Sequence, residues 1–402
     1  MESATDEILL EFATNACSIQ PHALPVEDEQ QSALAIVWWT NVVCLPTIAL
    51  IGLTCNLLNL LILTGNKAAR RIPSWHLLVA LAVFDSVFLI FATVEVTPMS
   101  IHALVSWQFF NTFYTHVALY IRTLASTFYK ASVLIVVAFN VERYVCVCHP
   151  LAAHRICTSR RSKQAIFVSL IVSFICSLQW PLVYNIMQCW DNMRNHSYYI
   201  ITMSENKFLQ GYYKTLDYFS LFAFNVAPIV VLFLLNLKLI STLRQVVDRD
   251  INRANNNNPL EPSRNGPMFS PSSESSSQRL NANAMLFAVV ALLFVCVGPQ
   301  APARLLYEYY GHYHSTAVIY TCISQQMVFL NAALNFCLYC LVSRRYRGLL
   351  KESLKSVFKP ESEFCTSTGI QLKTKFSTLQ SPSVTAAEES HPMLERRASA
   401  FH

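Results

Sequence analysis

The sequence predicts an all-α membrane protein, a bundle of seven membrane-spanning helices followed by a short amphipathic helix. Of the 402 residues, 53% are hydrophobic and only 13% are charged, whereas soluble domains carry about 25% charged residues. The apolar residues gather in seven runs of about 20 residues or more. Each run is long enough to cross a hydrocarbon core of about 30 Å as a helix. This composition excludes a chain of two or three soluble domains.

The seven runs define an expected transmembrane domain over 35-342. Its spans lie at about 35-64, 75-98, 113-147, 163-185, 213-243, 280-308 and 317-342. The loops after spans one, three and five are rich in Lys and Arg, whereas the opposite loops hold few. Because basic loops stay on the cytoplasmic side, we expect a multi-pass plasma-membrane protein with its N-terminus extracellular and its C-terminus cytoplasmic. The net charge of +6 therefore reflects membrane orientation, and no nucleic-acid partner is expected.

Polar segments precede and interrupt the spans. Residues 1-34 form an expected extracellular segment. Its first 31 residues lack the basic region and the apolar region that a cleaved signal peptide has, so we expect no cleaved signal peptide. The loop between spans four and five carries an Asn-His-Ser sequon at Asn195, which predicts glycosylation on the outer side. Low-complexity sequence at 255–278 predicts that 244-279 is a disordered third cytoplasmic loop.

The chain after span seven is expected to remain inside the cell. Residues 343-358 place apolar side chains near one helical face and Arg and Lys on the others, which predicts an amphipathic helix on the lipid of the inner leaflet. The Ser- and Thr-rich residues 359-402 predict a disordered cytoplasmic tail. Within it, Ser399 follows Arg396, Arg397 and Ala398 and so resembles a phosphorylation site for a basophilic kinase.

Several polar residues lie inside the predicted spans, where they are costly and therefore candidates for function. Asp85, Ser132, Asn331 and Asn335 are expected to form one polar cluster that holds a cation and water. The same residues would also suit plain hydrogen bonding between helices or the proton relay of a transporter. Cysteine and histidine spacings match no zinc site, and no catalytic or phosphate-binding motif is present, so we expect no enzyme activity and no structural metal.

A family resemblance emerges from several motifs taken in order. They are Asn56 in span one, LAVFD ending at Asp85, ERYVCVCHPL at 142–151, Pro228 in span five, CVGP at 296–299 and NFCLY at 335–339. Together these motifs resemble the rhodopsin-like (class A) G-protein-coupled receptors over about 35-358. Within that class, stretches at 142–178, 235–246 and 333–347 look most like the invertebrate FMRFamide-type neuropeptide receptors.

The resemblance implies roles for individual residues. Arg143 would engage the C-terminal helix of a heterotrimeric G protein, with Glu142 as its resting-state partner and Tyr144 on the coupling surface. The polar cluster around Asp85 would bind a sodium ion, with no other cofactor. The resemblance also assigns activation roles to Asn56, Pro228, Tyr339, which would rotate inward, and Pro299, which would kink span six. Arrestin and a receptor kinase would act on the tail.

The sequence departs from the family pattern at several positions. Val297 stands where the family has a Trp in span six, and Leu293, beside Phe294, stands where it has a Phe. Asn236 replaces an inward-turning Tyr, Phe336 replaces the span-seven Pro, and Arg279 stands where some members carry an acidic partner for the span-three Arg. We therefore expect a missing or rebuilt aromatic switch and no ionic lock between helices.

The expected outer disulfide is incomplete. Cys189 matches the family's cysteine in the second outer loop, but residues 86–145 contain no cysteine, so the usual partner at the top of span three is absent. The other outer cysteines are Cys17 and Cys322. A Cys17–Cys322 bridge, a Cys17–Cys189 bridge and free thiols all remain open at this stage.

The predicted ligand is an extracellular peptide ending in Arg-Phe-amide, which needs an acidic partner for its Arg and an aromatic pocket for its Phe. Glu308 or Glu95 is the expected partner, with Asp217 and Tyr307 nearby. Alternatively, these carboxylates pair with basic residues such as Arg122 and Lys130. The alternative functions are a receptor of the same fold for a chemosensory or other non-peptide ligand, and a membrane transporter.

Overall fold

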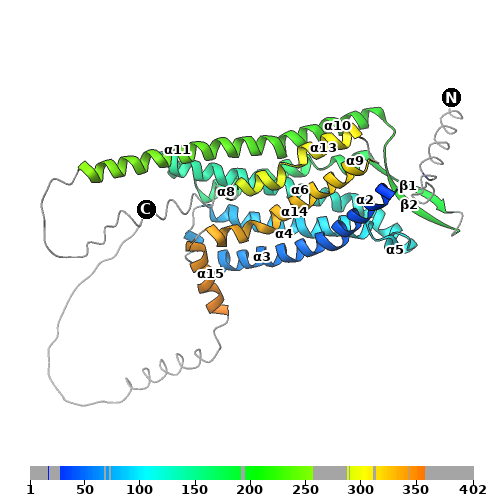
Figure 1. Cartoon of the computed structure of the whole chain (residues 1–402), viewed down its shortest axis with the longest axis horizontal. Helices are drawn as coiled ribbons and strands as arrows, with labels where there is room; N and C mark the ends of the chain where they lie inside the picture. The colour runs from blue at the N-terminus through cyan, green and yellow to red at the C-terminus, as the bar shows by residue number, and fades with distance from the viewer. Residues whose placement is uncertain are drawn as a thin grey trace, which may run out of the picture. The chain divides into compact units, whose positions relative to one another are not determined.

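The computed structural model describes residues 17, 28–67, 69–71, 74–191, 195–256, 288, 290–310, 314–342 and 344–357. Residues Met1–Ser353 form one compact unit and Leu354–His402 a second. Within the described part of the first unit, seven helical segments are long and apolar enough to cross a membrane. These segments lie side by side as an elongated bundle (Figure 1). The prediction of a seven-helix membrane bundle is confirmed.

The seven segments correspond one to one with the predicted spans. They are Ser32–Gly65, Trp75–Met99, Gln108–Cys148, Ser159–Val183, Lys207–Thr242, Val290–Tyr310 and Ser315–Leu341. The individual helices are α2 (Asp28–Trp39), α3 (Leu45–Gly65), α4 (Trp75–Met99), α5 (His102–Val105), α6 (Gln108–Cys148), α7 (Pro150–Ile156), α8 (Ser159–Ile175), α9 (Gln179–Val183), α10 (Lys207–Leu221), α11 (Ala227–Asn256), α13 (Gln300–Tyr310), α14 (Ser315–Val342) and α15 (Arg344–Val357). Short π-helical turns η1 (Thr40–Cys44) and η3 (Phe222–Val226) join α2 to α3 and α10 to α11, and the 3-10 turn η2 (Ala69–Arg71) follows α3.

Several helices extend beyond the predicted spans. Helix α6 begins at Gln108 rather than at 113, and α11 continues to Asn256. The predicted loop start at 244 is therefore corrected, because residues 244–256 are helical, while 257–279 lie outside the described residues. The physical reason is that an apolar run marks only the part of a helix that crosses the lipid, whereas polar turns extend it without leaving that signal.

A two-stranded antiparallel hairpin stands beside the helices and was not predicted. Strand β1 (Tyr184–Asp191) pairs with β2 (His196–Met203), with Cys189 opposite Tyr198. The predicted fourth span ended at 185, but its helical part ends at Val183 and the chain continues as β1. Aromatic and β-branched residues such as those of β2 favour strands, and Asn195 at the turn adopts a φ of 56°, which Asn tolerates better than most residues.

The apolar core lies in two clusters along the bundle. One contains Leu77, Ile135, Phe139 and Tyr339 on α4, α6 and α14, and the other contains Leu45 and its neighbours nearer the hairpin. Helices α3 and α14 approach closely at Gly52, where an added Cβ would lie 2.8 Å from the Ala333 Cβ. Only glycine fits this crossing, and it permits close backbone contact of the kind that drives helix association in lipid.

The sixth segment is interrupted where the sequence predicted a kink. A turn at Gly298 and Pro299 separates the residues before it from α13. The Gly298 amide donates to the Phe294 carbonyl at 3.0 Å, and the Pro299 carbonyl accepts from Ala303 at 3.1 Å. Because proline has no amide hydrogen, the regular hydrogen-bond ladder cannot continue through this turn.

The helix predicted at 343-358 is present as α15, described over Arg344–Val357. Tyr346 and Leu349 are buried, whereas Arg347 and Lys351 are exposed. The Tyr346 hydroxyl donates to Asn59 Oδ1 on α3, and Asn66 Nδ2 donates to Glu352 at 3.0 Å. The tail at 359-402, with Ser399, lies outside the described residues.

Candidate functional site

The bundle has two ends with different chemistry. We call the end beside β1 and β2 the hairpin end, and the end where α6 reaches Glu142, Arg143 and Tyr144 the Arg143 end. A cavity of about 900 Å³ opens among α4, α6, α9, α10, α13 and α14 toward the hairpin end. This volume lies within the range of about 300–1,000 Å³ that is typical of ligand sites.

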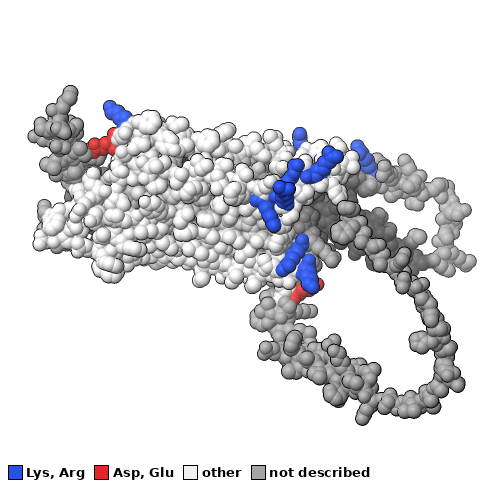
Figure 2. Space-filling model, turned by 180° about the vertical axis from the view of Figure 1, so that it is seen from behind, with Lys and Arg blue, Asp and Glu red and all other residues white. Residues whose placement is uncertain are grey.

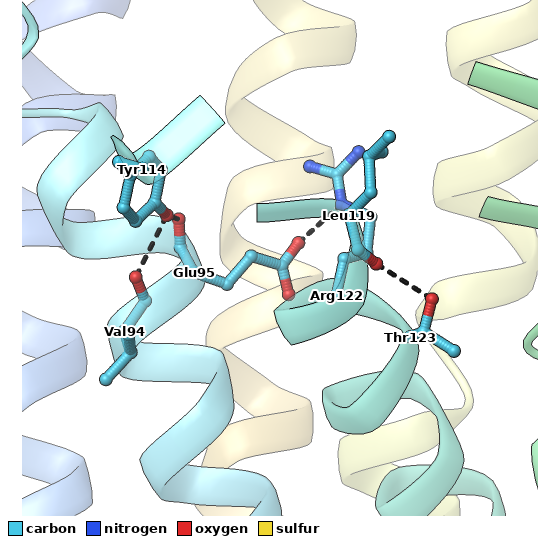
Figure 3. A network of polar contacts seen from close by, with 6 residues as sticks. All are labelled: Val94, Glu95, Tyr114, Leu119, Arg122 and Thr123. Carbon is cyan, nitrogen blue, oxygen red and sulfur yellow. Dashed lines mark hydrogen bonds and ion pairs between the residues drawn. The ribbon is translucent and has the colours of Figure 1, made fainter. Parts of the chain in front are cut away.

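One wall of the cavity is built around Glu95. The Tyr114 hydroxyl donates to the backbone carbonyls of Val94 and Glu95 at 2.9 and 2.5 Å, which holds the end of α4 against α6 (Figure 3). Arg122 Nε donates to Glu95 Oε1 at 2.6 Å, and its guanidinium lies 4.8 Å from the centre of the Trp180 ring. The structure therefore shows the alternative arrangement from the sequence analysis, in which Arg122 pairs with the Glu95 carboxylate.

The opposite wall is formed by α10 and α13. Arg304 donates to Asp217 Oδ2, forming an ion pair across the two helices. The exposed Glu308 accepts a hydrogen bond from the Tyr218 hydroxyl. Among the described residues no cation lies within ion-pair distance of Glu308, so its negative charge is free to face a ligand. Tyr307 lies between these residues on α13, but its side chain is outside the described part.

The hairpin is fastened to the bundle and to the N-terminal segment. Cys17 and Cys189 form a disulfide, and the Tyr198 hydroxyl donates to the Cys17 carbonyl at 3.2 Å. The Asn111 side chain makes two hydrogen bonds with the backbone of Tyr199, at 2.7 and 3.2 Å. Of the open alternatives, the structure adopts Cys17–Cys189 and leaves Cys322 as a buried thiol 2.7 Å from Thr40 Oγ1.

The predicted polar cluster forms in the middle of the bundle. Ser132 Oγ donates to Asp85 Oδ1 at 2.5 Å, and Asn335 Nδ2 donates to Asp85 Oδ2 at 2.7 Å. Asp85 is only 1% exposed. Asn331 is buried one turn earlier on α14, and Asn56 Nδ2 donates to the Ala332 carbonyl at 3.2 Å. Three helices are therefore connected through one buried carboxyl group.

The Arg143 end presents the ERY residues at the close of α6. Ser162 Oγ on α8 donates to Glu142 Oε1 at 2.6 Å. The Arg143 guanidinium lies 5.3 Å from the centre of the Phe139 ring, and the Tyr144 ring packs edge-on against His149 at 5.6 Å. Arg143 is half-buried rather than fully enclosed.

Two thiols lie beside these residues, outside the membrane-spanning segments. Cys146 Sγ lies 3.1 Å from Cys157 Sγ, and the Cys157 thiol is 3.5 Å from the Glu142 carbonyl. Burial, followed by the hydrogen bond with Cys146, raises the pKa of Cys157 above its ordinary value. Cys157 therefore remains a neutral thiol at physiological pH and is a poor nucleophile.

Comparison with known families shows which family this chain belongs to. Residues 55–340 match the 7 transmembrane receptor (rhodopsin family) pattern. The chain belongs to this family of G-protein-coupled receptors. It is 25% identical to the thyrotropin-releasing hormone receptor of Mus musculus over 357 residues, which cover 83% of this chain and 84% of that receptor. It is also 24% identical to the neuromedin U receptor homolog nmur-2 of Caenorhabditis elegans over 357 residues, 83% of each chain.

The likeness to FMRFamide receptors is narrower. The FMRFamide receptor of Drosophila melanogaster is 27% identical over 161 residues, which cover 39% of this chain and 27% of that receptor. The chain is a multi-pass membrane receptor with neuropeptide-receptor relatives. Because the family consists of receptors rather than enzymes, the expectation that the chain is not an enzyme is confirmed.

In this rhodopsin-family receptor, the side chains at the two positions where the family pattern has an aromatic switch are aliphatic. Val297 and Leu293 are fully buried, whereas Phe294 is 62% exposed and faces away from the core. Asn236 Nδ2 donates to the Leu232 carbonyl of the same helix at 2.7 Å. The centres of the Phe336 and Tyr346 rings lie 6.2 Å apart. Leu293 and Val297 therefore belong to the buried apolar cluster, and the expectation of a missing or rebuilt aromatic switch stays a prediction. Arg279 lies outside the described residues, and Pro228 is buried in α11.

Proposed function

We propose that this receptor binds an extracellular neuropeptide in the cavity and activates a heterotrimeric G protein at the Arg143 end. The main support is that one continuous helix, α6, lines the cavity with Arg122 and Tyr129 and carries Arg143 near its other end. At 1.5 Å per residue, Arg122 and Arg143 are about 30 Å apart along the helix. A ligand that prefers one arrangement of the cavity walls shifts the equilibrium between inactive and active states.

The ligand that suits the cavity best is an amidated peptide of the FMRFamide type. Glu308 supplies a carboxylate for the peptide's Arg, and aromatic residues supply a pocket for its Phe. The aromatic lining consists of Phe88, Tyr129, Trp180, Tyr184, Tyr213, Tyr218, Phe224 and Phe329. Glu95 and Asp217 are less suitable partners because each already pairs with an arginine.

We place the hairpin end outside the cell and the C-terminus inside. Figure 2 shows most of the visible Lys and Arg side chains gathered at one end of the bundle. The exposed basic residues of the Arg143 end include Lys67, Arg70, Arg155, Arg160, Arg161, Lys163, Arg244, Arg249, Arg347 and Lys351. The positive-inside rule puts this end in the cytoplasm of a plasma-membrane protein. The sequon at Asn195 lies at the exposed hairpin turn, where a glycan can be attached.

The same orientation assigns roles to the remaining parts. The turn at Gly298 and Pro299 allows the inner half of span six to move outward, and the buried Tyr339 is available to reorient during that motion. The movement opens a binding crevice for the G protein beside Arg143. Arrestin and a receptor kinase would then act on the tail that contains Ser399.

A sodium ion fits the polar cluster chemically. Among the described residues, the Asn56 Oδ1 and Tyr339 hydroxyl oxygens are buried without a hydrogen-bond partner, and Asp85 carries a carboxylate with no cation beside it. The oxygens of Asp85, Ser132 and Asn335 would hold the ion, because small hard cations prefer oxygen ligands. The bound ion would stabilise the inactive state by neutralising the buried carboxylate.

A peptide panel tests the proposed function. Cells that express the chain with a promiscuous G protein are exposed to Phe-Met-Arg-Phe-amide, its free-acid form, a thyrotropin-releasing-hormone peptide and a neuromedin U peptide. We expect a calcium signal with the amidated Arg-Phe peptide at a lower concentration than with the others. Activation by none of the peptides, together with activation by a small non-peptide ligand, would contradict the proposal.

A further inference from the structure

The deep part of the cavity contains a buried ammonium group. Lys130 is 5% exposed and lies on α6, and of the cavity-lining residues on that helix it is the furthest from the hairpin end. Arg122 lines the same helix eight residues earlier, about 12 Å nearer the opening. A lysine in this position is costly in a membrane protein and calls for a specific partner.

The contacts of Lys130 do not balance its charge. Nζ donates to the Cys176 carbonyl at 2.9 Å and to Ser177 Oγ at 3.2 Å, and it lies 5.6 Å from the centre of the Phe224 ring. Among the described residues no carboxylate lies within ion-pair distance of Nζ. An ammonium group has three N–H donors, so two are used by neutral acceptors and one is left.

The other charges of the cavity do not supply that partner. Asp217 pairs with Arg304, and Glu95 pairs with Arg122. Glu308 stands in the last turn of α13 near the hairpin end and accepts from Tyr218. The cavity therefore has an unbalanced carboxylate near its opening and an unbalanced ammonium at its deep end.

We propose that Lys130 is the anchor of an acceptor subsite, which binds a carboxyl or carboxamide oxygen at the buried end of the ligand. This inference deepens the proposed function and rests on the same cavity being the ligand site. A ligand that satisfies both ends carries its cationic group toward Glu308 and its carbonyl oxygen toward Lys130. The third N–H of Lys130 donates to that oxygen, and Phe224 and Tyr129 enclose the adjacent apolar group.

The test uses small probes rather than an unidentified ligand. Purified receptor is titrated with 3-phenylpropanoate, 3-phenylpropanamide and 3-phenylpropylamine, and the apparent dissociation constant is taken from the rise in thermal midpoint. We expect the carboxylate to bind wild type at least tenfold more tightly than the amine. A carboxamide that binds as well as the carboxylate identifies an amidated chain end as the source of the oxygen, and a weaker carboxamide identifies a free carboxylate.

Variants separate Lys130 from the other cations. Lys130→Met removes the charge but keeps the stem, and we expect it to lose the preference for the carboxylate about tenfold or more. Lys130→Arg keeps the charge and should retain the preference. Lys207→Met removes an exposed lysine of the hairpin end outside the cavity and serves as the matched control. Because Ser177 also bonds to Ser126 and Ser173, Lys130→Met is expected to fold, which the ligand-free midpoint checks.

The outcome is independent of the peptide panel. Equal binding of carboxylate and amine to wild type, or an unchanged preference in Lys130→Met, would overturn the Lys130 subsite even if a peptide activates the receptor. Conversely, a Lys130-dependent preference supports the subsite even if none of the peptides activates it.

Discussion

Both ends of the bundle contain an apolar cluster, but they differ in the polar and covalent contacts that join their elements. At the hairpin end, a disulfide and ion pairs surround a cavity of about 900 Å³, with Arg122–Glu95 and Arg304–Asp217 joining neighbouring helices. At the Arg143 end, an apolar cluster that includes Phe139 joins the helices. Polar contacts there are hydrogen bonds such as Ser162 to Glu142 and Tyr346 to Asn59.

This difference suits the two tasks of a receptor. Charged groups around a cavity can exchange their partners for those of a ligand, so binding can change how the walls are held. Apolar packing is not directional, and it lets helices move as bodies when the balance of contacts changes. The buried Asp85 cluster lies between the two regions and connects α4, α6 and α14.

The largest effect is expected at the Arg143 end. Replacing Arg143 by Ala should abolish ligand-stimulated nucleotide exchange, because it removes the cation that we propose engages the G protein. Surface expression should change little, since Arg143 is not part of the buried apolar cluster. Nucleotide exchange in membranes measures the effect, and Arg70→Ala, an exposed arginine at the same end, is the control. Unchanged exchange in Arg143→Ala would reject the coupling assignment.

At the hairpin end, the disulfide should contribute most to stability. Cys17→Ser opens a loop of 172 residues and is expected to lower the free energy of unfolding by about 2–5 kcal/mol. Thermal unfolding of the purified receptor, with and without reductant, measures the change. Cys322→Ser keeps a hydrogen-bonding group beside Thr40 and should have little effect. If reductant destabilises Cys17→Ser as much as wild type, the bridge does not stabilise this end.

The carboxylate near the cavity opening should affect potency rather than folding. Glu308→Gln removes the charge that would pair with the peptide's Arg, so we expect about a tenfold loss in the potency of an Arg-Phe-amide peptide. Dose–response curves at matched surface expression provide the measurement. Glu205→Gln, an exposed carboxylate outside the cavity lining, should leave potency unchanged. Equal potency of Glu308→Gln and wild type would exclude Glu308 from the site.

The smallest effect is expected from the ion pair between Glu95 and Arg122. The Arg122 side chain is 40% exposed, so solvent screens the pair and its coupling free energy should be about 1 kcal/mol or less. A double-mutant cycle with Glu95→Gln and Arg122→Gln, read by thermal unfolding, measures this term. A coupling of several kcal/mol would mean that this wall is as rigid as the apolar end.

The sequence predicted the membrane spans well, but it predicted few of the side-chain contacts between them. Seven apolar runs correspond to seven helical segments because lipid requires long apolar helices. The hairpin was missed, since Tyr184–Met203 lacks the length and hydropathy of a span. Lys130 was considered only as a possible partner for a carboxylate, although a charged residue within an apolar run is itself a signal of function.

The sequence by itself determined the membrane class, the seven helices and the family motifs. These features depend on local composition and on motifs that are close in the chain or match a known order. Only the tertiary structure decided that Cys17 bonds to Cys189, that Arg122 neutralises Glu95, and that Lys130 has no carboxylate partner among the described residues. Those pairings join residues far apart in sequence, and helix rotation and packing decide which of several chemically suitable partners comes within reach.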